Sequence, residues 1–154
     1  ETVIDAMDRL GDPRLRFLVV GNGPHLAALQ ASCAGRDDVI FAGRVVDGVG
    51  PYFDAADVFV LPGTGGLAVN EAMIHGLPII AGYGDGSIDD LVQDGVNGYR
   101  LRTGDAAELA GRLQLLAGDS ELRARQGAAS RELITTRFAF AGFSQRVTSL
   151  LTSL

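Results

Sequence analysis

A glycine-rich loop and a carboxylate stand close together in the sequence. The loop covers residues 63–66, and Glu71 follows it within one or two helical turns. Glycines between a strand and a helix N-terminus let backbone amides approach a ligand, and the unpaired amides and helix dipole there favour phosphate. A carboxylate one turn into the helix can accept hydrogen bonds from two vicinal hydroxyls. Phosphate beside hydroxyl groups indicates a nucleotide sugar.

The elements around this loop must position its amides and the carboxylate. An apolar strand at 58–61 ends at Pro62, a helix follows at 67–75, and a buried strand lies at 78–81. Glu71 has the apolar neighbours Ala68, Val69, Ala72 and Met73, an unusual setting for an idle carboxylate. The alternative is a flexible connection with a solvated Glu71, and we favour the functional interpretation.

The rest of the sequence alternates short apolar runs with helical patterns. It predicts helices at 2–10, 25–34, 52–56, 106–116, 121–135 and 141–151, a short helix and turn at 91–97, and strands at 16–20, 39–42 and 98–101. Asp105 is a candidate cap of the helix at 106–116. The C-terminal helices thus occupy about residues 105–153 of one domain, residues 1–154.

Buried strands that alternate with helices predict an α/β fold, a doubly wound, Rossmann-like parallel sheet with helices on both faces. Ligands of such folds bind beyond the carboxyl ends of the strands. The loop at 21–23, Gly43 and the loop at 63–66 all fall at that edge. The sequence therefore predicts the binding site there.

The sequence gives weaker support for two other kinds of site, a dinucleotide site and a metal site. The turn at 21–24 is a partial dinucleotide fingerprint, but Leu26 stands at its third glycine position and no acidic residue ends the next strand. His25 and His75 are isolated, so neither predicts a metal site, and His75 suits a helix end. Arg44 could face a phosphate or solvent.

The amino-acid composition argues against some classes of binding partner. The net charge of −6 argues against nonspecific nucleic-acid binding, and all thirteen basic residues are arginine. No apolar segment approaches the roughly 20 residues that span a bilayer. We expect a cytoplasmic protein, with any contact at the inner membrane surface made outside these residues. Because the first residue is Glu1, we also expect this chain to be a piece of a longer polypeptide.

Several strings, in this order, resemble the C-terminal, donor-binding domain of retaining glycosyltransferases of the GT-B fold, the group 1 glycosyltransferases. They are FLVVGNGP, FAGRV, YFDAADVFVLP, GLAVNEAMIHGLPIIA, DGVNGYRL and DAAELAGRLQLLAGD. The likeness covers nearly the whole chain and implies one half of a GT-B fold. Each string alone is weak, whereas their order and spacing together are specific.

The resemblance implies roles for named residues. Glu71 stands where the family's second glutamate binds the nucleotide ribose, and the backbone of Thr64, Gly65, Gly66 and Leu67 would face the diphosphate. Gly43, Arg44 and Val45 would border the base, and we add Gly23 to the donor-binding residues. The implied donor is a nucleoside diphosphate sugar, with no metal and no other cofactor, and the implied context is polysaccharide biosynthesis.

The sequence departs from the family's pattern at one position that concerns the transferred sugar. Gly63 occupies the place where the family usually carries its first glutamate, which contacts the sugar. A glycine there either leaves room for a different donor or marks a subfamily that uses loop backbone. The family's cationic pair and its acceptor-binding domain, which would hold a glycan or lipid, would precede Glu1. The sequence identifies no catalytic residue, and we expect this piece alone to be inactive.

Two alternatives remain open. Gly63 and the missing cations also suit a degenerate nucleotide-binding or interaction module. A nucleotide-sugar epimerase or an NAD-linked enzyme of similar fold is the third interpretation.

Overall fold

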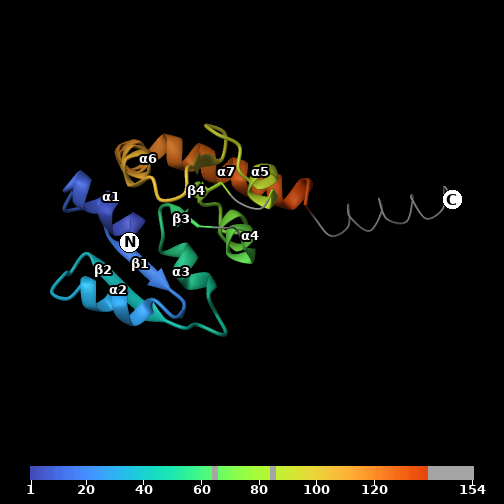
Figure 1. Ribbon diagram of the computed structural model, residues 1–154. Coiled ribbons are helices and arrows are strands. Elements are labelled where there is room, and N and C mark those ends of the chain that lie inside the picture. The colour runs from blue at the N-terminus through green and yellow to red at the C-terminus, as the bar shows by residue number, and fades with distance from the viewer. Residues whose placement is uncertain (64–65, 84–85, 139–154) are drawn as a thin grey trace, which may run out of the picture.

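The computed structural model describes residues 1–63, 66–83 and 86–138 (Figure 1). Its elements are α1 (Thr2–Leu10), β1 (Phe17–Val20), α2 (Leu26–Ser32), β2 (Val39–Gly43), α3 (Gly50–Asp54), β3 (Phe59–Leu61), α4 (Leu67–Ile74), β4 (Ile79–Gly82), α5 (Ser87–Leu91), β5 (Gly98–Leu101), α6 (Ala106–Gly118) and α7 (Ser120–Thr136).

Within the described residues, the strands pair in two parallel sheets. One contains β1 and β2, and the other has the order β3-β4-β5. In the second sheet, Val60 is level with Ile80, and Ile80 with Tyr99. Parallel strands need helical crossovers, which place the helices on the sheet faces.

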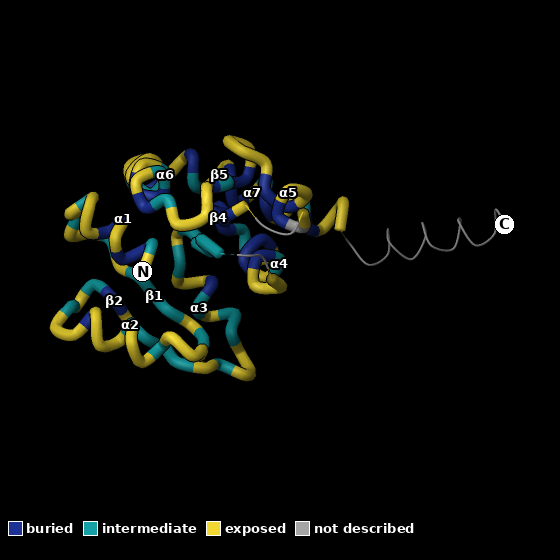
Figure 2. Tube along the Cα trace, in the orientation of Figure 1, coloured by how far each residue is buried: buried dark blue, intermediate teal, exposed yellow. Residues whose placement is uncertain are grey.

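The second sheet is covered on both faces. Ile80, Tyr99 and Leu101 belong to a core cluster with residues of α1 and α6, whereas Ile79 and Ala81 belong to a cluster with residues of α4, α5 and α7. Alternate residues of a strand face opposite sides, so β4 is buried along its whole length (Figure 2). The predicted α/β fold with helices on both faces is confirmed.

Local signals explain where several helices begin. The side chain of Asp105 accepts a hydrogen bond from the Glu108 amide at 2.8 Å, so the predicted cap of α6 is confirmed. Asp119 caps α7 in the same way through the Leu122 amide. Pro51 lies in the first turn of α3, a position that its fixed φ suits, and α3 therefore begins before the predicted residue 52.

The short helix and turn predicted at 91–97 are both present, but the helix lies earlier in the sequence than predicted. The helix here is α5, which ends at Leu91, and residues 92–97 form a turn around Gly95, whose φ is +78°. Two acidic residues, Asp89 and Asp90, stand in the first turn of α5, where the helix dipole favours negative charge. The helix predicted at 141–151 lies outside the described residues.

Among the described residues, no helix combines the length and the apolar character that crossing a membrane requires.

Candidate functional site

The loops after β1 and β2 form the first part of the site. The Gly21 amide donates to the Gly43 carbonyl at 2.8 Å and so ties the two loops together. Both glycines have positive φ, 134° and 72°, which side chains of other residues disfavour. The chain therefore turns sharply at the carboxyl ends of two adjacent parallel strands.

A hollow of about 420 Å³ opens between these loops and is lined by Asn22, Gly23 and Arg44. The Gly23 amide is held by the Asn22 side-chain oxygen at 2.8 Å. Arg44 is exposed and makes no ion pair with another described residue. Its guanidinium can therefore meet an anion that enters the hollow. Val45 follows and is half-buried.

The N-terminus of α4 forms the second part. Gly66, its N-cap, is extended with φ −176°, and no side chain caps the helix. The first amides of an uncapped helix need an outside partner, which favours anions. At Gly82, an added Cβ would lie 2.7 Å from the Pro62 carbonyl oxygen, so the chain after β3 runs directly over the end of β4. Thr64 and Gly65 lie outside the described residues.

Glu71 lies on the exposed stripe of α4. Leu67, one turn earlier on the same stripe, is 80% exposed. The apolar neighbours that suggested a crowded setting, Val69, Ala72 and Met73, are buried on the opposite face. That argument for Glu71 is therefore wrong, because neighbours in sequence point to different sides of a helix. The carboxylate has no hydrogen bond or ion pair with another described residue and is open to a ligand.

Two polar side chains near this edge escaped the sequence interpretation. Asn22 lines the hollow, and its place inside the glycine turn is the signal that could have found it. Asn70, next to Glu71, has a buried side-chain oxygen without a hydrogen-bond partner among the described residues. No spacing rule distinguishes Asn70 from an ordinary helix residue.

Tyr83 follows β4 at the same edge and is exposed. The Arg100 guanidinium lies 5.7 Å from its ring centre and pairs with Asp94 and Asp89 at 3.1 Å each. The hydrogen bond that the Arg100 guanidinium donates to the Asp94 carboxylate is the main cause that raises the pKa of Arg100. This cation is neutralised by protein carboxylates, in contrast to Arg44.

The opposite end of α4 is occupied by protein contacts. His75 Nδ1 lies 2.6 Å from an Asp54 carboxylate oxygen, and the imidazole stacks on Phe53 with ring centres 5.3 Å apart. The ring therefore links α4 to α3. These contacts favour the structural interpretation of His75.

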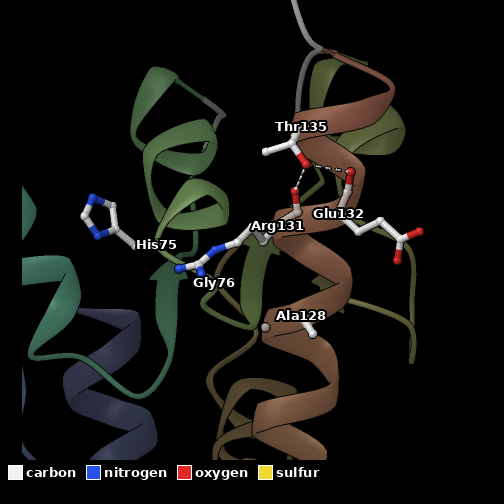
Figure 3. A pocket seen from close by; sticks show the side chains of 7 residues that line it. His75, Gly76, Ala128, Arg131, Glu132 and Thr135 are labelled. Atoms are coloured by element: carbon white, nitrogen blue, oxygen red, sulfur yellow. Dashed lines mark hydrogen bonds between the residues drawn. The ribbon is translucent and has the colours of Figure 1, made fainter.

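A second hollow, of about 480 Å³, lies between this end of α4 and α7 (Figure 3). Arg131 Nε donates to the Ile74 carbonyl at 2.9 Å and so caps the C-terminus of α4. At Gly127, an added Cβ would lie 2.0 Å from the Gly76 carbonyl oxygen, so the two backbones touch. This end of α4 serves helix packing.

Among the described residues, no group of three His, Cys, Asp or Glu side chains could hold a metal ion.

Comparison with known proteins finds relatives over most of the chain. The family described as glycosyl transferases group 1 matches residues 1–119. A sulfoquinovosyl transferase of Arabidopsis thaliana is 33% identical over 86% of this chain, which spans 26% of that protein. An N-acetyl-alpha-D-glucosaminyl L-malate synthase of Bacillus anthracis is 30% identical over 80% of this chain, which spans 33% of that protein.

Solved structures are similar over almost all of the chain. HepE of Anabaena, in complex with UDP and glucose, has a TM-score of 0.82 at 24% identity, with 99% of this chain and 44% of that chain covered. The C-terminal domain of a group 1 glycosyl transferase, LpcC of Francisella tularensis, has a TM-score of 0.74 at 23% identity, with 90% and 78% covered.

Proposed function

The chain belongs to the group 1 glycosyltransferases, and from this we propose that it is the donor-binding part of an enzyme that transfers a sugar from a nucleoside diphosphate sugar to a glycan or lipid acceptor. The chain spans between a quarter and a third of the first two relatives described above. The acceptor would therefore be held by polypeptide outside these residues.

The observation that carries this proposal is the pairing of an uncapped helix N-terminus with a carboxylate one turn further on, Glu71, which has no partner among the described residues. The amides at Gly66 and Leu67, together with those of Thr64 and Gly65, would receive the diphosphate. Glu71 would accept hydrogen bonds from the two ribose hydroxyls, since an ionised carboxylate is an acceptor only. A nucleoside diphosphate presents these two chemistries side by side.

The hollow at Asn22, Gly23 and Arg44 supplies a place for the rest of the donor. We assign Gly43, Arg44 and Val45 to the border of the base. Two neighbours of similar fold were solved with UDP, one with glucose and one with GlcNAc, which supports a nucleotide-sugar donor here. The proposed reaction uses no metal and no other cofactor.

The setting of the reaction is part of the proposal. We place the protein in the cytoplasm and its product in polysaccharide biosynthesis, with any membrane contact made by polypeptide outside this chain. Charge builds on the leaving diphosphate during transfer and must be stabilised by preorganised donors or cations. The α4 amides and Arg44 would share this role with residues outside the chain.

The test replaces Glu71 by alanine in the full-length protein and measures binding of UDP and other nucleoside diphosphates by calorimetry. A hydrogen bond to a charged group contributes about 1.5–3 kcal/mol, so we expect binding to weaken about 10- to 150-fold. Glu132→Ala is the matched control. Glu132 is also exposed on a helix, α7, but it lines the second hollow, beside the C-terminal end of α4 and away from the proposed donor site.

Comparing a nucleotide with its 2′,3′-dideoxy form tests whether Glu71 acts through the ribose hydroxyls. The 2′,3′-dideoxy form of the nucleotide should bind the natural protein more weakly than its parent, and Glu71→Ala should bind both equally. Unchanged binding by Glu71→Ala would refute the donor role of this carboxylate. Donor binding without sugar transfer to any acceptor by the full-length protein would favour the degenerate binding module instead.

A further inference from the structure

One aromatic side chain stands at the edge of the second sheet where the proposed donor site lies. Tyr83 directly follows β4, at the carboxyl end of that strand, and it is 51% exposed. Its amide donates to the Leu101 carbonyl at 2.9 Å, so its backbone is held beside the end of β5. A half-exposed tyrosine ring is thus presented from an ordered position.

The ring of Tyr83 lies on the face of the sheet that α4 covers. Successive residues of a strand face opposite sides, and Tyr83 continues the series of Ile79 and Ala81, which pack with residues of α4 and α5. Arg100 is level with Ala81 in β5, and its guanidinium lies 5.7 Å from the centre of the ring. The ring and the N-terminus of α4 therefore share one face and one edge of the sheet.

Arg100 supports this ring from a fixed position. Its guanidinium pairs with Asp89 and Asp94 at 3.1 Å each. It lies within the roughly 6 Å of the ring centre at which a cation attracts an aromatic face. Because half of Tyr83 remains exposed, the supported ring still offers apolar area to a ligand.

The chain that leaves β3 passes close to the residue before Tyr83. An added Cβ at Gly82 would lie 2.7 Å from the Pro62 carbonyl oxygen and 3.1 Å from that of Gly63. At Gly63, in contrast, an added Cβ would meet no described atom within 4 Å. Space is therefore open beside Gly63, which itself offers no side chain to a ligand. Side-chain contacts there have to come from neighbouring residues such as Tyr83.

The order of the parts of a nucleoside diphosphate sugar indicates which part reaches Tyr83. This step rests on the proposed function, which places the base at the loops after β1 and β2 and the diphosphate at the N-terminus of α4, after β3. The sugar follows the diphosphate in the ligand, and β4 lies next to β3 in the second sheet. We infer that the ring of Tyr83 stacks on the transferred sugar and selects pyranoses with an unhindered face of C–H groups.

Calorimetry of the full-length protein tests this inference by comparing each nucleotide sugar with its own nucleoside diphosphate. The probes are UDP-glucose, UDP-N-acetylglucosamine and GDP-mannose, beside UDP and GDP. Tyr83→Ala should weaken binding of the most tightly bound nucleotide sugar about 2- to 10-fold, the range of one aromatic contact. Binding of the diphosphate alone should not change, which also shows that the variant is folded. Tyr83→Phe should keep both affinities, because the ring makes the contact.

Val96→Ala is the matched control. Val96 is 52% exposed, but it lies in the turn before β5, at the opposite end of the strands, so neither affinity should change. The inference is overturned if Tyr83→Ala binds the nucleotide sugar normally, if it binds both ligands equally weakly, or if the sugar adds no affinity in the natural protein. In these three cases, binding of the diphosphate still supports the proposed function. A natural protein that binds no nucleotide refutes the proposed function, and the inference with it.

Discussion

The strands β1 and β4, one from each sheet, are both apolar but have very different surroundings. β1 reads FLVV and β4 reads IIAG, yet β4 is buried throughout whereas three residues of β1 are half-buried and its last is exposed. Helix α2, which connects β1 to β2, buries no residue, whereas α4 buries Val69, Ala72 and Met73. In Figure 2 the buried residues gather around β4 and the exposed ones around α2 and β2. Apolar composition alone therefore does not determine how firmly a strand is held.

The difference follows from what each sheet packs against. β4 lies between two strands and between two layers of helices. β1 and β2 have one shared core cluster, formed with Ile4 of α1 and Cys33 after α2. The second sheet is thus stabilised by its own core, whereas the first depends on its contacts with α1 and with the end of α2.

The largest expected effect comes from making the same truncation in both sheets. Ile80→Ala removes a fully buried side chain of β4, and we expect a loss of about 2–5 kcal/mol in the free energy of unfolding. Ile40→Ala, in β2, removes a side chain that is already half in water and should cost below about 1 kcal/mol. Urea unfolding of both variants measures the comparison, and equal losses would contradict it.

The next largest loss of stability is expected at the close contact between α7 and the residues that follow α4. Gly127→Ala would drive a methyl group into the Gly76 carbonyl oxygen, and we expect a loss of about 1–3 kcal/mol or more. Gly111→Ala is the matched control, because Gly111 is an exposed helix residue with no atom near the added Cβ. That variant should gain about 0.5–1 kcal/mol from helix propensity. A neutral Gly127→Ala would mean that α7 can move away from α4.

Much of the fold could be predicted from the sequence because apolar runs bounded by glycine mark strand ends. The strand predicted at 39–42 is β2, Val39–Gly43, and the strand at 98–101 is β5. The separation into two sheets could not be predicted, since it depends on which distant strands meet. Of the short helix and turn predicted at 91–97, the turn is present around Gly95, whose φ is positive, but the helix was placed too late because α5 ends at Leu91.

The site was only partly predictable for a similar reason. Glycine spacing located the loop at 21–23, where Gly21 has a positive φ, and the N-terminus of α4, where no side chain caps the first amides. The surroundings of Glu71 depend on the rotation of α4 against the core, which sequence neighbours do not reveal. The donor-binding roles of these residues remain predictions.

Surface ion pairs should contribute more to the stability of the first sheet, β1 and β2, than to that of the second. Arg36 donates to Asp8 at 2.6 Å and to Asp38 at 2.7 Å, and so connects α1 to the start of β2. We expect Arg36→Ala to lower the urea midpoint by less than Gly127→Ala does. The loss should shrink in 1 M salt, because salt screens exposed charges. A loss that is independent of salt would indicate that the aliphatic stem, and not the charge, holds β2.

The smallest expected effect lies in the turn between α1 and β1. Hydrogen bonds from Arg14 lower the pKa of Asp12 from 3.8 to about 2. A carboxyl group whose pKa is lower in the folded state stabilises the protein fully above its unfolded pKa, and this contribution disappears as the pH falls. For Asp12, the window therefore lies between about pH 4 and pH 2.

Urea unfolding across this window, with Asp12→Asn beside the natural protein, measures the contribution. The variant lacks the titrating group, so its stability should fall less steeply between pH 4 and pH 2. Arg14→Leu should behave similarly, because it removes the partner that lowers the pKa. Asp38, whose pKa Arg36 lowers, titrates in all three proteins, so the difference between the curves isolates the Asp12 pair. Parallel curves would show that this turn is not held by charge, and that β1 depends on apolar packing alone.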